Sequence, residues 1–568
     1  MVSIDVYLQR RMQNSNCGTN IHSQNHYLTM KQKHFFTILL LSVATLAGAQ
    51  KPPLDWFHLD PAKDGFPGLR TNKAYEGPLK GKTSQTVIVA VIDSGVDAEH
   101  EDLRNVMWTN PGEIAGNGKD DDDNGYIDDI HGWNFLGGKD GRNVGADNLE
   151  VVRQYRAYDA RFKNADASKL SAADKKDYEK YKEYEGVIAE KRKQAKQNME
   201  LYGPVVEALN DLVKHIGKDP FQVSEEDVRK VKSNKPSVTR ATRVALSVMG
   251  GSGQTLGDVK RDLEEYYTHL DDEYNYNYNL DYNPRNIVGD NYADVDEKGY
   301  GNNDVKGPDA THGTHVAGII GAQRNNNIGM DGVAGNVRIM SVRTVPNGDE
   351  HDKDVANAIL YAVDNGALVI NMSFGKGASP HKAAIDRAVR YAAKRDVLLI
   401  HGAGNDGQEI DLQNNFPNRS YLKKGLFGPK YAANWMEVGA THWKGGEMLA
   451  AEFSNYSSKY VDIFAPGVDI YSTDVDNQYR NLQGTSMAAP MVAGAAAVLR
   501  SYFPQLTAVQ VKNILVSSSS KQNIDVIIPG GEDKVPFKSL STTGGILDLE
   551  AAVRMAEQTQ GKRKTVAP

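Results

Sequence analysis

Three short segments place an acid, a histidine and a serine where each could take part in catalysis. The segment VIDSGVD ends an apolar run with Asp93, the segment HGTHVAG begins with His312, and the segment GTSMAAP contains Ser486. A serine hydroxyl becomes a nucleophile when a neighbouring base removes its proton, and a histidine can serve as that base. A carboxylate can then orient the imidazole and stabilise its charged form. Each segment alone is weak evidence, but together they predict nucleophilic catalysis by the serine.

The order Asp, His, Ser and the residues around each motif resemble the subtilisin-like serine proteases (subtilase, peptidase S8 family). The segments VINMSFG, AGNDG and FAPG extend this resemblance. It implies a catalytic triad of Asp93, His312 and Ser486 that cuts peptide bonds through an acyl-enzyme intermediate. It also implies that the Asn405 side-chain amide and the Ser486 backbone N–H stabilise the oxyanion. His315 is the rival base, but the resemblance assigns that role to the first histidine of the motif.

The resemblance further implies how peptide or protein substrates bind. Ser373, Phe374 and Gly375 would pair with an extended peptide, with Gly404 nearby and the loop 347–351 on the other side. Acidic residues in and around that loop leave two interpretations open: a preference for basic substrates, or solvated loop acids.

An acidic loop offers a first calcium site. Asp120, Asp122, Asn124 and Asp128 occupy positions 1, 3, 5 and 9 of an EF-hand-like pattern that has glycine at position 6. Position 12 is His131 instead of the usual glutamate, so the loop departs from a full EF-hand. The spacing of the oxygen ligands nevertheless predicts Ca²⁺ binding, with a solvated acidic run as the alternative.

A second calcium site follows from the resemblance alone. The segment NNNIG, which contains Asn326, is similar to the family's calcium loop after the catalytic-histidine helix, and Asp102 matches the carboxylate that joins it. Three backbone carbonyls would complete the site, those of Arg324, Ile328 and Met330. The predicted role of calcium at either site is structural.

Composition excludes several other classes of protein. The 568 residues are 40% hydrophobic and 24% charged, which is typical of a globular chain, and the formal net charge is only −7. A short basic tail at 559–568 is the sole basic run, so a nucleic-acid partner is not expected. Cys17 is the only cysteine and lies ahead of the predicted mature chain. That chain therefore has neither disulfides nor a cysteine nucleophile.

The N-terminal region predicts export. Residues 30–49 combine a basic start, an apolar run at 35–41 and a final AGA, the pattern of a secretory signal peptide. Residues 1–29 resemble an upstream segment that is not part of the protein, and 50–85 form an N-terminal extension. We expect a secreted, periplasmic or cell-surface protein without a stable membrane span after signal removal. The alternative is a single N-terminal membrane anchor.

The remaining chain predicts an α/β fold. Apolar runs such as 87–92 alternate with helix-like segments, as in a parallel sheet covered by helices on both faces. The resemblance makes this a subtilisin-like three-layer fold with a mostly parallel central sheet, formed by residues 86–148 and 281–558. Residues 149–280 are a charged helical insertion between the catalytic Asp and His. In 171–200, 15 of 30 residues are charged.

The insertion leaves further interpretations open. It is either an exposed helical hairpin or an arm that contacts a protein partner. An alternative function is therefore a catalytically idle subtilisin-like binding or scaffold protein that acts through the insertion. A calcium-binding adhesion protein is a third possible function. The presence of all four catalytic positions favours the protease.

Overall fold

The computed structural model describes residues 51–250, 253–423 and 428–563. The predicted signal peptide and the segment before it therefore lie outside the described residues. The described chain divides into a larger unit, residues 52–197 and 270–563, and a smaller unit, residues 198–269 together with Lys51. In the described part of the chain, no helix combines the length and apolarity that a membrane crossing needs.

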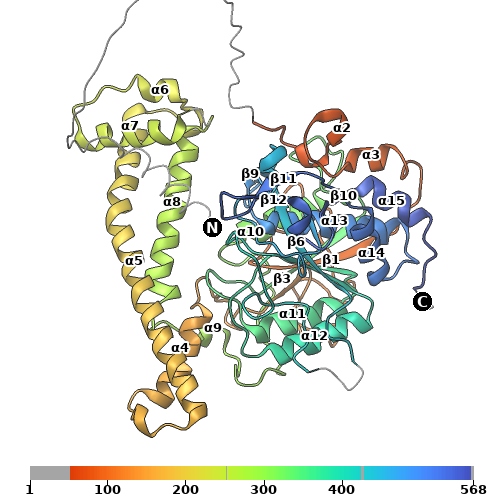
Figure 1. Cartoon of the computed structure of the whole chain (residues 1–568), viewed down its shortest axis with the longest axis horizontal. Helices are drawn as coiled ribbons and strands as arrows, with labels where there is room; N and C mark the ends of the chain where they lie inside the picture. The colour runs from red at the N-terminus through yellow and green to blue at the C-terminus, as the bar shows by residue number, and fades with distance from the viewer. Residues whose placement is uncertain (1–50, 251–252, 424–427, 564–568) are drawn as a thin grey trace, which may run out of the picture. The chain divides into compact units, whose positions relative to one another are not determined.

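A nine-stranded sheet forms the centre of the larger unit (Figure 1). The strand order is β10-β13-β7-β6-β5-β4-β1-β3-β2, and every neighbouring pair is parallel except β10 with β13. The strands are β1 (Val87–Asp93), β2 (Gly132–Asn134), β3 (Val337–Arg343), β4 (Val369–Met372), β5 (Leu398–Gly402), β6 (Trp435–Thr441), β7 (Ile463–Pro466), β10 (Ser520–Lys521) and β13 (Gly545–Ile546). Two hairpins lie outside this sheet, β8 (Ile470–Asp474) with β9 (Gln478–Leu482) and β11 (Asp525–Ile527) with β12 (Lys534–Pro536).

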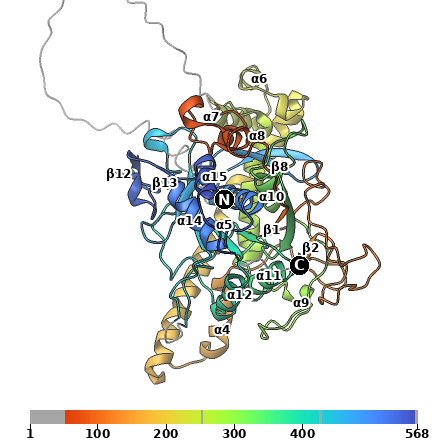
Figure 2. The ribbon, with the colours of Figure 1, turned by 90° about the vertical axis from the view of Figure 1, so that its right-hand side faces the viewer.

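Helices cover both faces of the sheet, which explains the uninterrupted apolar strands. Along β1, Val89 and Val91 belong to one hydrophobic core and Ala90 and Ile92 to the other. The first core is closed by α10 (Thr311–Gly321), α13 (Thr485–Tyr502), α14 (Ala508–Ser518) and α15 (Leu549–Glu557), the second by α11 (Asp352–Asp364) and α12 (Lys382–Lys394). Figure 2 shows α14 and α15 on the opposite side of the sheet from α11 and α12. The predicted three-layer fold with a mostly parallel sheet is confirmed.

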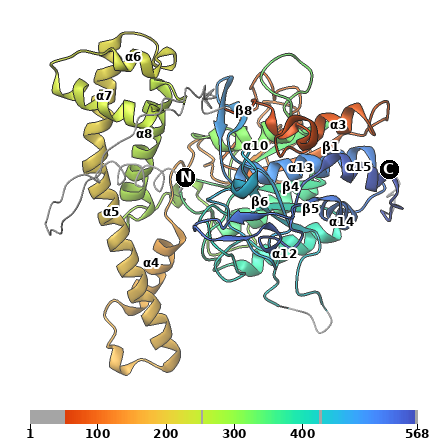
Figure 3. The ribbon, with the colours of Figure 1, turned by 45° about the horizontal axis from the view of Figure 1, so that its top comes forward.

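The N-terminal extension packs onto this body. It contains the short 3-10 turn Trp56–His58, α2 (Pro61–Asp64) and α3 (Thr71–Glu76). Trp56 and Phe57 are buried in the core that contains α13 and α15. The Arg70 guanidinium forms an ion pair with Asp548, the residue that caps α15. Figure 3 shows α3 beside α15. The extension is thus an integral part of the larger unit.

Residues 150–277 contain only helices and their connections, apart from the two residues that the structure does not describe. The helices are α4 (Glu150–Phe162), α5 (Ala172–Ile216), α6 (Glu225–Arg229), α7 (Pro236–Met249), α8 (Leu256–Asp272) and a π-helical turn (Glu273–Asn277), followed by α9 (Arg285–Val288). In the larger unit, Ile188 of α5 packs against Val152 and Tyr278. In the smaller unit, Tyr202 and Tyr266 meet edge to face with ring centroids 5.0 Å apart.

Candidate active site

Asp93 lies at the carboxyl end of β1, between β3 and β4 in the sheet. Its side chain is buried, and its Oδ1 atom accepts hydrogen bonds from the Ser94 backbone N–H at 2.8 Å and from His312 Nδ1 at 2.7 Å. The carboxyl ends of parallel strands form the edge where side chains from separate chain segments can meet. The Asp93 carboxylate is therefore placed to fix the tautomer of the His312 ring.

His312 is the second residue of α10, and its side chain is 38% exposed. The helix can approach β1 because the next residue is Gly313: a Cβ there would lie 2.1 Å from the Gly95 carbonyl oxygen. Burial of the ring opposes protonation of His312, but the Asp93 carboxylate outweighs it and raises the pKa above the ordinary 6.5. A histidine with Nδ1 bound to a carboxylate presents Nε2 as the basic atom.

His315 has a different environment. It is fully buried in α10, and its Nε2 atom contacts the Arg480 carbonyl oxygen at 3.1 Å. Burial lowers the pKa of His315 to about 3, so the ring stays neutral. A buried ring whose Nε2 is bound to the backbone fits packing and not proton transfer to a substrate.

Ser486 lies in the first turn of α13, directly after the helix start at Thr485. Its hydroxyl donates to the Ser373 carbonyl oxygen at 3.1 Å, and the Ser373 hydroxyl donates to the Ser486 carbonyl oxygen at 3.0 Å. The serine is thus joined to the segment that follows β4 and is not hydrogen-bonded to His312. Catalytic hydrogen bonds are often loose before substrate binds and tighten in the reacting complex.

Two N–H donors converge beside this serine. The Asn405 Oδ1 atom accepts from the backbone N–H and the hydroxyl of Thr485, at 2.9 and 3.0 Å, which turns its NH₂ group away from Thr485. The ideal Cβ position on Gly484 lies 3.3 Å from Asn405 Nδ2 and 3.5 Å from the Ser486 backbone nitrogen. Both donors therefore border one small space, as an oxyanion hole requires.

The four residues predicted to bind substrate follow β4 and β5, which are neighbours in the sheet. Ser373, Phe374 and Gly375 come directly after β4. Gly404 follows β5 with φ of 99°, and a Cβ there would lie 2.4 Å from Asn455 Nδ2, so this position requires glycine. The structure places both segments at the edge that carries Asp93.

The loop 347–351 differs from the predicted second substrate strand. The Asn347 backbone N–H donates to the Gly145 carbonyl oxygen at 2.9 Å, and its own carbonyl accepts from Asp147 N–H at 3.1 Å. This edge of the loop is thus already paired with the chain that leads into α4. The sequence gives no signal for this pairing, because it joins residues about 200 positions apart.

The acidic loop brings together only some of the predicted calcium ligands. Oxygens of Asp120 and Asp122 lie within 4.8 Å of each other and of Glu113, so these three carboxylates could share one cation. Asn124 contacts the same loop through Asp122. Asp128 instead accepts hydrogen bonds from the backbone N–H groups of 116–118. Glu113 was missed because it lies outside the EF-hand-like window.

The second predicted calcium pair is also in contact. Asn326 Nδ2 lies 2.6 Å from Asp102 Oδ1, and the Met330 backbone N–H donates to Asp102 Oδ2 at 3.1 Å. Asp102 is buried, and its side chain contacts the 325–329 loop. Asn325 and Asn327 of this loop adopt positive φ. Both carboxylate oxygens of Asp102 are thus hydrogen-bonded. A turn of the Asn326 amide would bring its oxygen towards a cation bound there.

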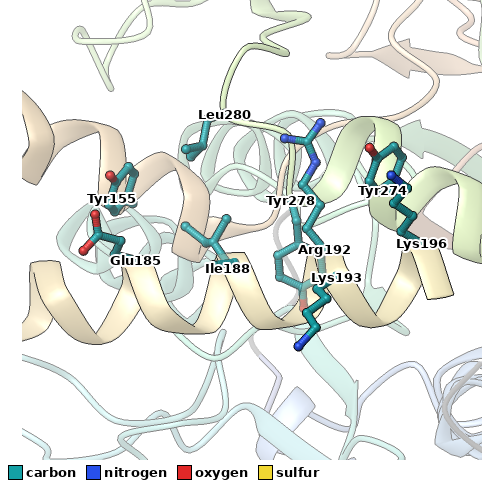
Figure 4. A pocket seen from close by; sticks show the side chains of 10 residues that line it. Tyr155, Glu185, Ile188, Arg192, Lys193, Lys196, Tyr274, Tyr278 and Leu280 are labelled. Carbon is teal, nitrogen blue, oxygen red and sulfur yellow. The ribbon is translucent and has the colours of Figure 1, made fainter. Parts of the chain in front are cut away.

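A groove of about 540 Å³ lies on the helical segment of the larger unit. Figure 4 shows Tyr155, Glu185 and Ile188 at one end and Lys196 with Tyr274 at the other. The Arg192 guanidinium lies over the Tyr274 ring, 4.8 Å from its centroid. None of the lining residues belongs to the predicted catalytic or calcium sites.

Comparisons with known proteins identify several protease relatives. The thermophilic serine proteinase of Bacillus sp. (strain AK1) is 38% identical over 44% of this chain and 53% of its own length. The alkaline protease of Alkalihalobacillus alcalophilus is 38% identical over 37% of this chain and 50% of its own. Thermitase of Thermoactinomyces vulgaris is 37% identical over 38% of this chain and 72% of its own length.

This chain spans about half the length of the first two relatives. The match to the family is broader. The profile described as "Subtilase family" (Peptidase S8) covers residues 84–544, which include Asp93, His312, Asn405 and Ser486 as well as the helical segment between the first two. The chain therefore belongs to the subtilase family.

Proposed function

We propose that this protein is an exported serine endopeptidase in which Asp93, His312 and Ser486 act as the catalytic triad. The observation that carries the proposal is the 2.7 Å hydrogen bond between Asp93 and His312, residues 219 positions apart. It lies at the sheet edge where Ser486 and two N–H donors also meet. Family membership and protease relatives support the same reaction.

The proposed mechanism begins when His312 Nε2 removes the hydroxyl proton of Ser486 as its oxygen attacks the peptide carbonyl. Asp93 stabilises the imidazolium that forms, which agrees with the raised pKa of His312. The negative oxygen enters the space between Asn405 Nδ2 and the Ser486 N–H. His312 then gives its proton to the leaving amine, and water repeats the sequence on the acyl-enzyme.

The test is labelling of Ser486. A fluorophosphonate probe should form one adduct on this residue in the full mature chain, and Ser486→Ala should abolish both the adduct and peptide hydrolysis. Absence of the adduct in folded protein would contradict the proposal and favour the catalytically idle binding or scaffold protein. Binding through the helical segment would then be the remaining function.

Export and calcium belong to the same proposal. Cleavage of the signal at 30–49 would give a mature protein that starts at Gln50, which N-terminal sequencing can check. The Glu113, Asp120 and Asp122 oxygens fit a hard cation such as Ca²⁺. Bound there, Ca²⁺ would offset the repulsion among three carboxylates and hold the loop in shape.

A further inference from the structure

His401 lies next to the segments after β4 and β5 that would bind the substrate. It belongs to β5, which pairs with β4 and leads directly to Asn405. The P1 residue, which supplies the attacked carbonyl, has to sit between the Asn405 donor and the Ser373 carbonyl that contacts Ser486. Its side chain therefore enters between the chains that follow β4 and β5.

Gly375 lies beside His401, whose Nε2 atom is buried. A Cβ on Gly375 would lie 3.1 Å from the Phe416 carbonyl oxygen, 3.7 Å from His401 Nε2 and 3.7 Å from Asn415 Oδ1. Asn415 is held there because the next residue, Phe416, exchanges two backbone hydrogen bonds with Lys376, at 2.9 and 3.0 Å. A side chain that passes Gly375 thus meets a ring nitrogen and an amide oxygen next to each other.

The His401 ring and the Asn415 amide both contact the Glu437 carboxylate. His401 Nδ1 is 2.7 Å from Glu437 Oε1, and both side chains are buried. The Asn415 Nδ2 group faces the same carboxylate at 3.4 Å, which turns its Oδ1 atom away from Glu437. Trp435 Nε1 donates to the other oxygen of Glu437 at 2.8 Å and holds the carboxylate in place.

His401 Nε2 has no partner of normal hydrogen-bond geometry among the described residues. Burial opposes a charge on the ring, but Glu437 outweighs it, and the nearby Phe374 carbonyl acts in the same direction, so the pKa is raised above 6.5. The raised pKa favours the protonated ring, which carries a hydrogen on Nε2 for a substrate acceptor.

We propose that His401 and Asn415 make this protein selective for a carboxamide side chain, glutamine or asparagine, at P1. The imidazole Nε2–H would donate to the side-chain carbonyl oxygen, and the Asn415 oxygen would accept from the side-chain NH₂ group. A carboxylate matches less well because it has no hydrogen for Asn415 and comes near Glu437. The inference rests on the proposed protease function and names the specificity of that same site.

The test uses peptides that differ only at P1. We expect kcat/KM for glutamine to exceed that for methionine, and for asparagine to exceed that for leucine, in at least one pair by about tenfold or more. Glutamate should be cut more slowly than glutamine. Equal or faster cleavage after methionine and leucine by the wild-type enzyme would overturn the inference.

Variants assign the preference to the two side chains. His401→Leu and Asn415→Ala should each bring the preferred ratio close to one. Asn414→Ala is the matched control, because this neighbouring asparagine is exposed, and it should keep the wild-type ratio. An unchanged ratio in Asn415→Ala would overturn the inference even if His401→Leu did not fold.

Labelling of Ser486 separates the two levels of the proposal. A wild-type enzyme that forms the fluorophosphonate adduct and cuts peptides without preferring a carboxamide contradicts only the P1 assignment. A folded wild-type protein with neither adduct nor hydrolysis contradicts the protease function and the P1 assignment together.

Discussion

At the scale of single residues, the pKa of His312 sets the acid limit of activity. The base must be neutral, and Asp93 raises its pKa above 6.5, so kcat/KM should fall with an apparent pKa above 6.5 as the pH is lowered. Asp93→Asn should move this limb to lower pH and reduce kcat by about 10⁴-fold. The measurement is the pH profile of kcat/KM for both proteins. A wild-type limb below pH 6.5 would contradict the assignment.

Asn405 offers a second prediction for a single atom. Asn405→Ala removes one donor to the developing oxyanion and should lower kcat by about 10²–10³-fold with little change in KM. Asn105→Ala is a suitable control, since that asparagine is exposed and its amide donates a hydrogen bond to the Gln323 side chain. A loss in KM alone would instead assign Asn405 to ground-state binding.

Sequence motifs indicated the proposed triad because each residue sits at the end of an apolar strand or the start of a small-residue helix. Such local patterns can be recognised in the amino-acid sequence alone. His401 and Glu437 were not predicted, because a histidine and a glutamate inside apolar runs become a pair only when β5 and β6 lie side by side. The pairing of Asn347 was missed for the same reason. Contacts between distant segments leave no local signal.

At the scale of elements, a buried ionic cluster joins α4 to the segment that follows the proposed substrate strand. Lys376 Nζ lies 3.1 Å from Glu150, the first residue of α4, and 3.0 Å from Asp352, the first residue of α11. All three side chains are almost fully buried. The Arg153 guanidinium of α4 contacts Glu150 as well, at 2.6 Å. The start of α4 is thereby fixed to the rest of the larger unit.

Removal of the central cation should be costly. Lys376→Met leaves the Glu150 and Asp352 carboxylates buried with less compensating charge, and we expect a loss of about 3–5 kcal/mol in unfolding free energy. Lys182→Met is the matched control, because its ion pair with Glu185 is about half exposed and should contribute below about 1 kcal/mol. Denaturant titration of both variants measures the difference. Equal losses would show that the cluster contributes no more than a surface pair.

The same cluster should make stability depend on pH. Burial opposes the charge on Glu150, but Lys376 and Arg153 outweigh it and lower its pKa to about 2, from an ordinary value of 4.5. A lowered pKa contributes stability that is present above pH 4.5 and is lost as the pH falls towards 2. The difference in unfolding free energy between wild type and Glu150→Gln should therefore narrow across this window. A difference that stays constant would contradict the role of Glu150 as a buried anion.

At the scale of the whole molecule, the predicted calcium sites should couple metal binding to unfolding. A cation that binds only the folded chain stabilises it by an amount that grows with its concentration, about 2.7 kcal/mol at 100 times Kd. Oxygens of Glu113, Asp120 and Asp122 lie within 4.8 Å of one another, close enough to share one cation. A chelator should therefore lower the unfolding temperature by a few degrees, and added Ca²⁺ should restore it.

Two variants of one loop decide whether this cluster is responsible. Asp122→Asn removes a carboxylate of the cluster and should abolish most of the calcium-dependent shift in Tm. Asp123→Asn removes the same charge one residue later, at a position with φ of 56° that asparagine also tolerates, and should keep the shift. Differential scanning calorimetry with and without Ca²⁺ measures both. If both variants keep the full shift, calcium stabilises the fold elsewhere, and Asp102→Asn then tests the loop that contains Asn326.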